Sequence, residues 1–324
     1  MKALVYTAPE TLALQNVPPP QALGETLVDV AFCGICGSDM HAYLGHDERR
    51  PAPLTLGHEA TGTTRDGRQV VINPLVTCMD CEACLSGRTN LCPNRQIISM
   101  PPRPGAFCAT VALPERNLLP LPKNLSLEVA ALTEPLACGW HAAKLAARHS
   151  ETPLGEARVL VLGGGAIGLG CALSLAAKGA REIAIFEPNR ARWDTIAAAG
   201  PFTPVGADEA SALAPEVVID AYGGGRSRAL ASAVVRPGGI IVHVGLADND
   251  AGLDTRRATL QEITFVGAYT YTAADFAETL DALAAGTFGP LGWTEVRALE
   301  DGPAAFADIR AGRVAAAKII LKIN

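Results

Sequence analysis

One stretch limits the fold of this chain more than any other: an apolar run that ends in a glycine turn. Val159-Leu160-Val161-Leu162 carries no polar side chain, which is typical of a strand buried on both faces of a parallel sheet. It runs directly into Gly163-Gly164-Gly165-Ala166-Ile167-Gly168, which satisfies G-x-G-x-x-G at residues 163, 165 and 168. The pattern predicts a strand, a tight turn and a helix in immediate succession.

The chain after this turn continues to alternate between strands and helices. Helices separate the further expected strands, which lie at 183–186, 217–220, 239–244 and 263–267. Such alternation is typical of a doubly wound α/β domain built on a parallel sheet. Glu187 ends the second strand, about 20 residues after the turn, where a carboxylate accepts hydrogen bonds from the adenosine ribose. The stretch therefore predicts a dinucleotide-binding domain.

The carboxylate of Glu187 would repel the 2′-phosphate of NADP, so the sequence favours NAD. Arg190 and Arg192 are close enough in sequence to bind such a phosphate, because guanidinium groups recognise phosphate well. We interpret both arginines as solvated residues at the start of a helix. Arg192 also remains a candidate contact to the cofactor.

A second group of motifs lies much earlier in the chain. It consists of C-G-S-D-x-H at 36–41 and G-H-E at 57–59. Cys36, His58 and Glu59 combine a thiolate, an imidazole and a carboxylate, the mixture that a catalytic Zn²⁺ takes when one coordination position stays open. Ser38 and His41 lie on the same local turn, where a hydroxyl and an imidazole could pass a proton outward. Together with a nucleotide turn, this set indicates alcohol oxidation by hydride transfer.

A third motif groups four cysteines within one short segment, at Cys78, Cys81, Cys84 and Cys92. Four thiolates at such spacings can close a tetrahedron around Zn²⁺ and leave no position for substrate. We therefore expect a structural zinc that stabilises an otherwise coreless loop. Surface thiols clustered by chance are the alternative, and this spacing disfavours them.

Composition excludes several classes of partner. The 324 residues are enough for two domains, and the net charge of −6 argues against nucleic acid or an anionic membrane surface. No apolar run reaches the roughly 18 residues of a spanning helix. The first residues lack the pattern of a signal peptide. With nine cysteines, four of them in one lobe, we expect a metal-binding cytoplasmic protein and no disulfide framework.

Taken in order, these motifs resemble the zinc-containing medium-chain alcohol dehydrogenases, and within them the sorbitol (polyol) and threonine dehydrogenase branch. The resemblance also includes E-P-L at 134–136 and the closing K-I-I-L at 318–321. It implies a GroES-like, β-rich catalytic domain interrupted by a Rossmann NAD-binding domain. The expected bounds are 1–137 and 269–324 for the catalytic domain, with the zinc lobe at about 78–92, and 138–268 for the Rossmann domain.

The resemblance also assigns roles. It implies that Cys36, His58 and Glu59 hold a catalytic zinc, that the four clustered cysteines hold a structural zinc, and that Ser38 and His41 relay the alcohol proton. Glu134 takes the place that branches of the family fill with a cysteine ligand or with a carboxylate near the metal's water. Cys138, one helical turn further on, is its rival.

The expected activity is hydride transfer between NAD(H) and a secondary alcohol of a polyol or sugar derivative. A threonine-like amino-alcohol dehydrogenase and an inactive NAD(H)-binding sensor are the alternatives. Sorbitol dehydrogenases usually carry an arginine in the stretch corresponding to 267–271, and its absence here disfavours sorbitol itself. The family implies a homodimer or homotetramer, with the strand at 265–271 as the candidate seam.

Some residues receive a plainer interpretation. Arg49 and Arg50 are expected to be solvated in an exposed loop. His243 has no partner that the sequence reveals, and the same holds for His46, His141 and His149. Pocket lining and ordinary core packing are equal alternatives for four aromatic residues: Tyr43, Phe107, Tyr269 and Tyr271.

Overall fold

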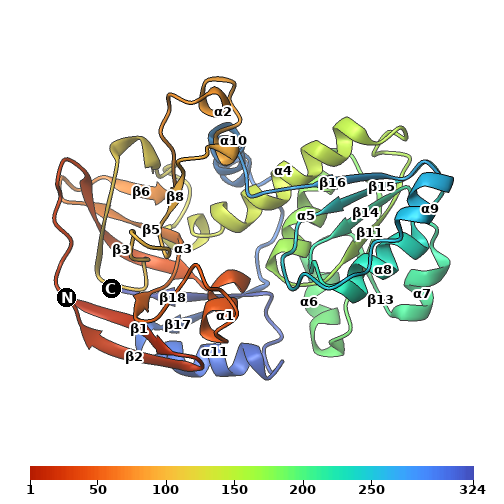
Figure 1. Cartoon of the computed structure of the whole chain (residues 1–324). Coiled ribbons are helices and arrows are strands. Elements are labelled where there is room, and N and C mark those ends of the chain that lie inside the picture. Colours follow the sequence, from red (N-terminus) through yellow and green to blue (C-terminus); the bar gives the residue numbers. More distant parts are fainter. The chain divides into compact units, whose positions relative to one another are not determined.

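The computed structural model describes all residues from 1 to 324, and the chain divides into two compact units (Figure 1). Unit 1 contains residues 1–134, 272–285 and 294–324, and unit 2 contains 135–271 and 286–293. Three segments that we expected in the catalytic domain belong to unit 2 instead; they are residues 135–137, 269–271 and 286–293.

Unit 1 is built around a seven-stranded, largely antiparallel sheet with the order β10-β6-β5-β3-β18-β17, to which β9 adds by pairing with β3. Its strands are β3 (Thr26–Gly34), β5 (Glu59–Thr64), β6 (Gln69–Ile72), β9 (Thr110–Leu113), β10 (Leu118–Pro120), β17 (Thr294–Ala298) and β18 (Lys318–Lys322). Strand β18 pairs antiparallel with β3, so the end of the chain returns to its beginning. A smaller sheet joins β2 (Thr11–Asn16), β1 (Lys2–Ala8) and β4 (Leu54–Thr55).

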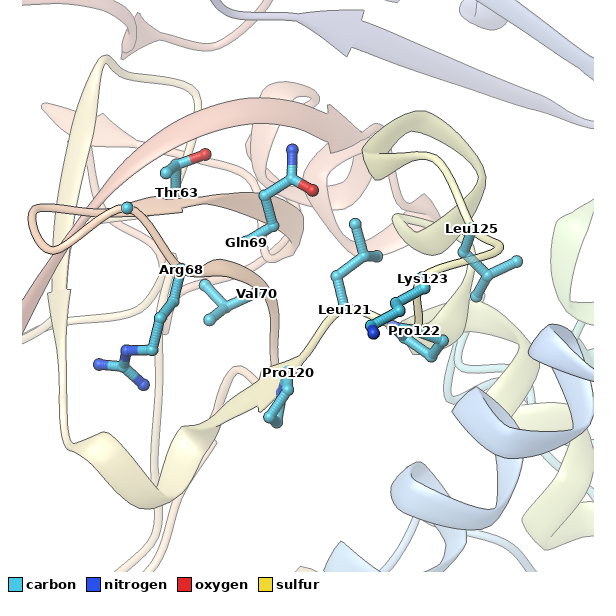
Figure 2. A pocket seen from close by; sticks show the side chains of 10 residues that line it. Thr63, Arg68, Gln69, Val70, Pro120, Leu121, Pro122, Lys123 and Leu125 are labelled. Atoms are coloured by element: carbon cyan, nitrogen blue, oxygen red, sulfur yellow. The ribbon is translucent and has the colours of Figure 1, made fainter.

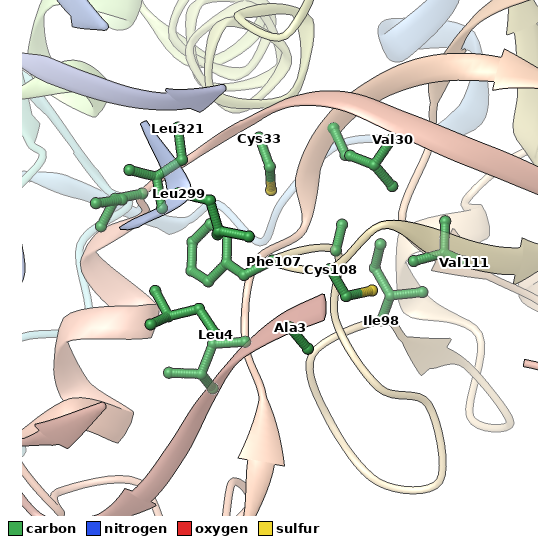
Figure 3. Packing of buried hydrophobic residues seen from close by; sticks show 14 of the residues in the cluster. Ala3, Leu4, Val30, Cys33, Ile98, Phe107, Cys108, Val111, Leu299 and Leu321 are labelled. Carbon is green, nitrogen blue, oxygen red and sulfur yellow. The ribbon is translucent and has the colours of Figure 1, made fainter. Parts of the chain in front are cut away.

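The core of unit 1 fills the space between these sheets and two helices, α1 (Gly37–Tyr43) and α11 (Gly302–Arg310). Figure 3 shows Phe107 in this cluster, with Leu4 and Leu321 nearby. Phe306 of α11 meets Phe107 edge-on, with ring centroids 6.1 Å apart, and Tyr43 at 5.3 Å. Tyr43 and Phe107 are therefore core residues, since each lies buried in this aromatic group.

The four-cysteine lobe follows β7 (Leu75–Val76), which pairs with β8 (Gln96–Ile97). Between these strands lie a single helical turn, α2 (Glu82–Leu85), and the 3₁₀ turn η1 (Thr89–Leu91). Cys84 and Cys92 are buried, whereas the large apolar side chains of Met79, Leu85 and Leu91 are exposed. The lobe thus has little apolar core of its own, which is the condition under which a structural metal stabilises a fold.

The remaining helices of unit 1 are short, apart from α10 (Ala273–Ala284); they are η2 (Glu115–Asn117), α3 (Leu127–Ala130) and η4 (Leu299–Asp301). Helix α4 (Thr133–His149) starts at the end of unit 1 and continues in unit 2. Glu134 lies in the first turn of α4, where a carboxylate is favoured by the positive end of the helix dipole.

Unit 2 is a doubly wound domain, as the strand–helix alternation predicts. Its six strands are all parallel in the order β13-β12-β11-β14-β15-β16. They are β11 (Arg158–Leu162), β12 (Glu182–Phe186), β13 (Phe202–Val205), β14 (Val217–Asp220), β15 (Ile240–His243) and β16 (Thr264–Gly267). The helices are α5 (Ala166–Ala177), η3 (Arg190–Arg192), α6 (Trp193–Ala199), α7 (Ala207–Ala212), α8 (Gly225–Val234) and α9 (Thr255–Leu260).

Strand β13 was not expected, because Thr203-Pro204 interrupts its apolar pattern. Proline is tolerated at the edge of a sheet, and β13 is an edge strand. The strand order reverses between β11 and β14, which is the point where doubly wound sheets bind nucleotides. No helix of the chain is both long and apolar enough to cross a bilayer.

Candidate active site

The junction between β3 and α1 places the first group of site residues. Cys36 is the residue before α1, and its backbone N–H donates to the Asp39 carboxylate at 3.0 Å. This reciprocal contact at the start of α1 fixes the helix immediately after the cysteine. Ser38 and His41 then follow on the same short helix, as the sequence predicts for a shared local turn.

Sheet register brings the other two candidate ligands to Cys36. Glu59 begins β5 and lies opposite Gly34 of β3, two residues before Cys36. The ligand atoms of Cys36, His58 and Glu59 all lie within 4.8 Å of one another, close enough to share an ion. Glycine at position 34 leaves room for the Glu59 carboxylate, because a Cβ atom there would lie 2.0 Å from Glu59 Oε2.

The carboxylate of Glu59 has one satisfied oxygen and one free oxygen. Lys318 Nζ donates to Oε1 at 2.6 Å and to the Ile35 carbonyl at 2.8 Å, and both side chains of the ion pair are buried. Burial lowers the pKa of Lys318, but the charges of Glu59 and Cys36 outweigh it and raise this pKa. Glu59 Oε2 is buried with no hydrogen-bond partner. Such an orphaned oxygen beside a thiolate and an imidazole fits a metal ligand.

His58 is held from behind by Asp39. Its Nδ1 lies 3.5 Å from Asp39 Oδ1, an ion-pair distance too long and poorly aligned to satisfy Nδ1 as a hydrogen bond. Asp39 is fully buried and also accepts from the Gly57 backbone N–H at 3.1 Å and from the Ser99 hydroxyl at 3.3 Å. Burial acts to raise the pKa of Asp39, but His58 and the hydrogen bonds lower it to about 2. A carboxylate behind the imidazole is the usual support of a metal-binding histidine.

The environment of Arg50 differs from the exposed loop that the sequence predicts. Arg49 is exposed, as predicted, but Arg50 is buried, with only 4% of its surface accessible. Its guanidinium donates from Nε to the Ser99 carbonyl at 2.9 Å and from Nη1 to Asp47 at 2.5 Å. Nη2 reaches the Ser38 hydroxyl at 3.4 Å. The sequence could not show this burial, because the three partners lie in three separate segments of the chain.

His41 is half-buried on α1. Burial lowers the pKa of its imidazole, and repulsion from His46 lowers it further. His41 is therefore neutral at pH 7 and able to accept a proton.

The four clustered cysteines form a second candidate metal site. Their sulfur atoms lie within 4.8 Å of one another, and those of Cys78 and Cys92 are 3.4 Å apart. Burial acts to raise the pKa of Cys92, but hydrogen bonds from Cys78 outweigh it and lower this pKa to about 7. Four sulfur atoms brought this close together fit a structural metal.

The glycine turn of unit 2 has the geometry of a nucleotide-binding loop. Gly163 has a φ of 106°, and a Cβ at Gly168 would lie 1.7 Å from the Gly163 carbonyl oxygen. Helix α5 then starts at Ala166, with its N-terminus at the turn. Glu187 is buried beside the turn and accepts from the Gly164 backbone N–H at 2.9 Å. Arg192 Nη1 lies 3.8 Å from its carboxylate.

A polar cluster that the sequence did not reveal lies at the ends of β14 and β15. His243, for which we expected no partner, has Nδ1 at 3.1 Å from Asp220 Oδ2. Asp220 is fully buried and also accepts from the Ser227 hydroxyl and the Gly223 backbone N–H, at 3.0 and 2.8 Å. The cluster fixes the loop that follows β14 at the carboxyl edge of the sheet.

Glu134 is not one of the three residues whose ligand atoms cluster. It is buried, and its charge acts on Lys318 together with those of Glu59 and Cys36. Cys138, its rival, lies on α4 within unit 2.

A separate pocket of about 570 Å³ lies in unit 1, between the β5–β6 hairpin and the segment after β10 (Figure 2). Val70, Leu121 and Leu125 line it, together with Arg68, whose guanidinium is paired with Asp66 and Glu115. None of the candidate metal, relay or cofactor residues lines this pocket, so we assign it no part in the reaction.

Known proteins resemble the whole chain. Residues 22–123 match the family model described as the alcohol dehydrogenase GroES-like domain. A probable D-xylulose reductase A of Aspergillus clavatus is 32% identical, over 89% of this chain and 87% of its own length. The L-galactonate-5-dehydrogenase of Escherichia coli is 31% identical, over 88% of each chain. Among solved structures, an alcohol dehydrogenase of Thermus sp. ATN1 superposes over the full length of both chains with a TM-score of 0.89 and 25% identity.

Proposed function

Because the chain belongs to the family of zinc-containing medium-chain alcohol dehydrogenases, we propose that it transfers a hydride between NAD(H) and a secondary alcohol of a polyol or sugar derivative. The observation that carries this proposal is the cluster of Cys36, His58 and Glu59, with the orphaned Glu59 Oε2 inside it. The names of the relatives support a polyol or sugar-acid substrate, since they act on D-xylulose and L-galactonate.

Zinc would be held by the Cys36 thiolate, the His58 imidazole and Glu59 Oε2, and when bound it acts as a Lewis acid that makes a hydroxyl more acidic. Lys318 keeps the other oxygen of Glu59 occupied, and the Asp39 carboxylate lies 3.5 Å behind His58 Nδ1. These two partners let the protein hold three ligands while a fourth position stays open to substrate.

The overall reaction releases one proton for each hydride transferred. Bound NAD would supply the hydride acceptor, and the alcohol would lose one hydride and one proton in total, so that a ketone, NADH and H⁺ result. Ser38 accepts the proton from the alcohol oxygen as its own hydroxyl proton leaves, and His41 passes a proton outward. Glu134 would supply a carboxylate near the metal, as a direct ligand or through water.

The cofactor proposed is NAD rather than NADP. The Glu187 carboxylate lies buried at the end of β12 beside the glycine turn, where it would meet the adenosine ribose. Arg192, close to this carboxylate, would contact the same ribose. The backbone N–H groups of 163–168 and the N-terminus of α5 would bind the pyrophosphate.

A second zinc would be structural, held by Cys78, Cys81, Cys84 and Cys92. The nine free cysteines support a reducing, cytoplasmic compartment. We also propose a homodimer or homotetramer that joins unit 2 sheets through β16. This strand is at the sheet edge, and Phe265 on it is exposed.

A substrate panel tests the proposal. Zinc-loaded protein is given NAD with xylitol, L-galactonate and L-threonine, or NADH with D-xylulose, and the absorbance of reduced nicotinamide is followed. Turnover of a polyol or sugar acid, lost in Cys36→Ser, is expected. Turnover of L-threonine alone supports the amino-alcohol dehydrogenase, and NADH binding without turnover of any alcohol supports the sensor.

A further inference from the structure

Arg50 is a buried cation whose guanidinium nitrogens contact Asp47, Ser99 and Ser38. Its Nη1 pairs with Asp47 at 2.5 Å, which supplies the opposite charge that a buried guanidinium needs. Its Nε donates to the Ser99 carbonyl at 2.9 Å. Two partners on separate turns therefore fix the plane of the guanidinium and aim Nη2 at Ser38.

The contact with Ser38 has a defined direction. A guanidinium only donates hydrogen bonds, whereas a serine hydroxyl has one proton and two acceptor lone pairs. Arg50 Nη2 therefore occupies one lone pair of Ser38 Oγ, and the hydroxyl proton has to point elsewhere. The second lone pair stays available to an alcohol hydroxyl. This is the orientation that a relay from substrate to His41 requires.

The separation of 3.4 Å is at the long end for a hydrogen bond. Contacts in catalytic sites are often long before substrate binds and shorten in the reacting complex. A hydrogen bond from a cation strengthens as the acceptor oxygen gains negative charge. The Arg50 contact is therefore worth most when the proton of Ser38 is leaving.

The hydrogen bonds of Arg50 also extend to the residues that lie behind His58. Ser99 accepts from Arg50 through its carbonyl and donates through its hydroxyl to Asp39 Oδ1 at 3.3 Å. Asp39 in turn lies behind His58. Arg50 is thus connected to the relay directly and to the metal-facing histidine through two intermediate residues.

We propose that Arg50 is a positioning residue for proton transfer, which holds the Ser38 hydroxyl in the orientation of the relay. This inference rests on the proposed function, because it needs Ser38 to carry the alcohol proton. Arg49 provides a matched control: it is the neighbouring arginine and pairs with the same Asp47, but its side chain is 63% exposed.

The test is a double-mutant cycle on zinc-loaded protein with D-xylulose and NADH as the probe. Arg50→Gln is expected to lower kcat about tenfold, with KM, zinc content and NADH affinity little changed, since a charged hydrogen bond of this kind is worth about a factor of ten. It should also raise the solvent deuterium isotope effect on kcat. Arg50→Lys keeps the charge but not the three-way geometry, so we expect an intermediate rate. Arg49→Gln should leave the rate within a factor of two.

The cycle is closed in a Ser38→Ala background, where Arg50→Gln should produce no further loss of kcat because its target is gone. Independent losses that multiply would overturn the proposal, as would an isotope effect identical in Arg50→Gln and wild type. Loss of zinc or of NADH binding in both Arg50 variants would show a structural role instead and would also overturn it. A wild-type protein that turns over neither D-xylulose nor L-galactonate rejects the proposed function itself, and this outcome is visible before any variant is made.

Discussion

Each candidate ligand of the catalytic metal is held by a partner that performs no chemistry of its own. Asp39 accepts from the backbone of Cys36 and lies behind the imidazole of His58, and Lys318 holds one oxygen of Glu59. A glycine two residues before the cysteine leaves room for the second oxygen. The candidate metal site is therefore marked by ligand atoms that no protein group satisfies, such as Glu59 Oε2.

Replacement of Gly34 tests that spatial requirement. In Gly34→Ala the new Cβ would overlap Glu59 Oε2, so the carboxylate must move and the catalytic zinc should be lost. We expect zinc content, measured by atomic emission, to fall from two per chain to one. Gly37→Ala is the matched control, because a Cβ there meets no atom within 4 Å. Two bound zinc ions in Gly34→Ala would show that Glu59 is not a ligand.

Removal of Lys318 tests its charge balance with Glu59. Lys318→Met leaves a buried carboxylate unpaired, which costs about 3–5 kcal/mol. Zinc supplies a compensating charge, so we expect a larger loss in the free energy of urea unfolding for metal-free than for zinc-loaded protein. Lys322→Met, at the exposed end of the same strand, should alter neither. Equal losses with and without zinc would argue against the Glu59–metal contact.

The protonation of His41 should make the rate of alcohol oxidation depend on pH. Because burial lowers its pKa, His41 remains a neutral proton acceptor below pH 6.5, and the rate of alcohol oxidation should fall only as the pH drops through this lowered value. His41→Gln should reduce kcat about 10²-fold and abolish that titration. The measurement is kcat against pH for both proteins. An unchanged profile in the variant would remove His41 from the relay.

At the scale of elements, local sequence patterns predicted what local geometry determines. The strand, glycine turn and helix at 158–177 follow from an apolar run and the spacing of glycines, and the four-cysteine lobe follows from its own short spacing. Strand β13 was missed because its apolar signal is weakened by a proline that only an edge strand tolerates.

Loss of one cysteine from the four-cysteine lobe tests whether a metal stabilises this segment. Cys84→Ser should remove the structural zinc and increase hydrogen exchange across 78–92, because few buried apolar side chains hold this segment otherwise. The catalytic zinc should remain. Glu82→Ala, which alters a solvent-exposed side chain of the same helical turn, is the control. Unchanged hydrogen exchange in Cys84→Ser would contradict a structural role for the metal.

At the scale of the whole molecule, the residues that sequence analysis missed have partners far away in the chain. Lys318 meets Glu59 across 259 residues, and the ends of β14 and β15 bring Asp220 to His243. The burial of Arg50 has the same cause, because its partner Ser99 lies 49 residues away in the chain and a pair of adjacent arginines by itself predicts a solvated cluster. Motifs identified the chemistry, but only the sheet register shows what supports it.

The dependence of catalysis on the metal is tested by the rate of D-xylulose reduction by NADH as zinc is titrated into metal-free protein. We predict that turnover appears in proportion to occupancy of the site at Cys36, His58 and Glu59. Cys84→Ser should therefore turn over with a single bound zinc, whereas Cys36→Ser with a single bound zinc should not. Full turnover by metal-free protein, or by zinc-loaded Cys36→Ser, would show that no metal at this site takes part in the reaction.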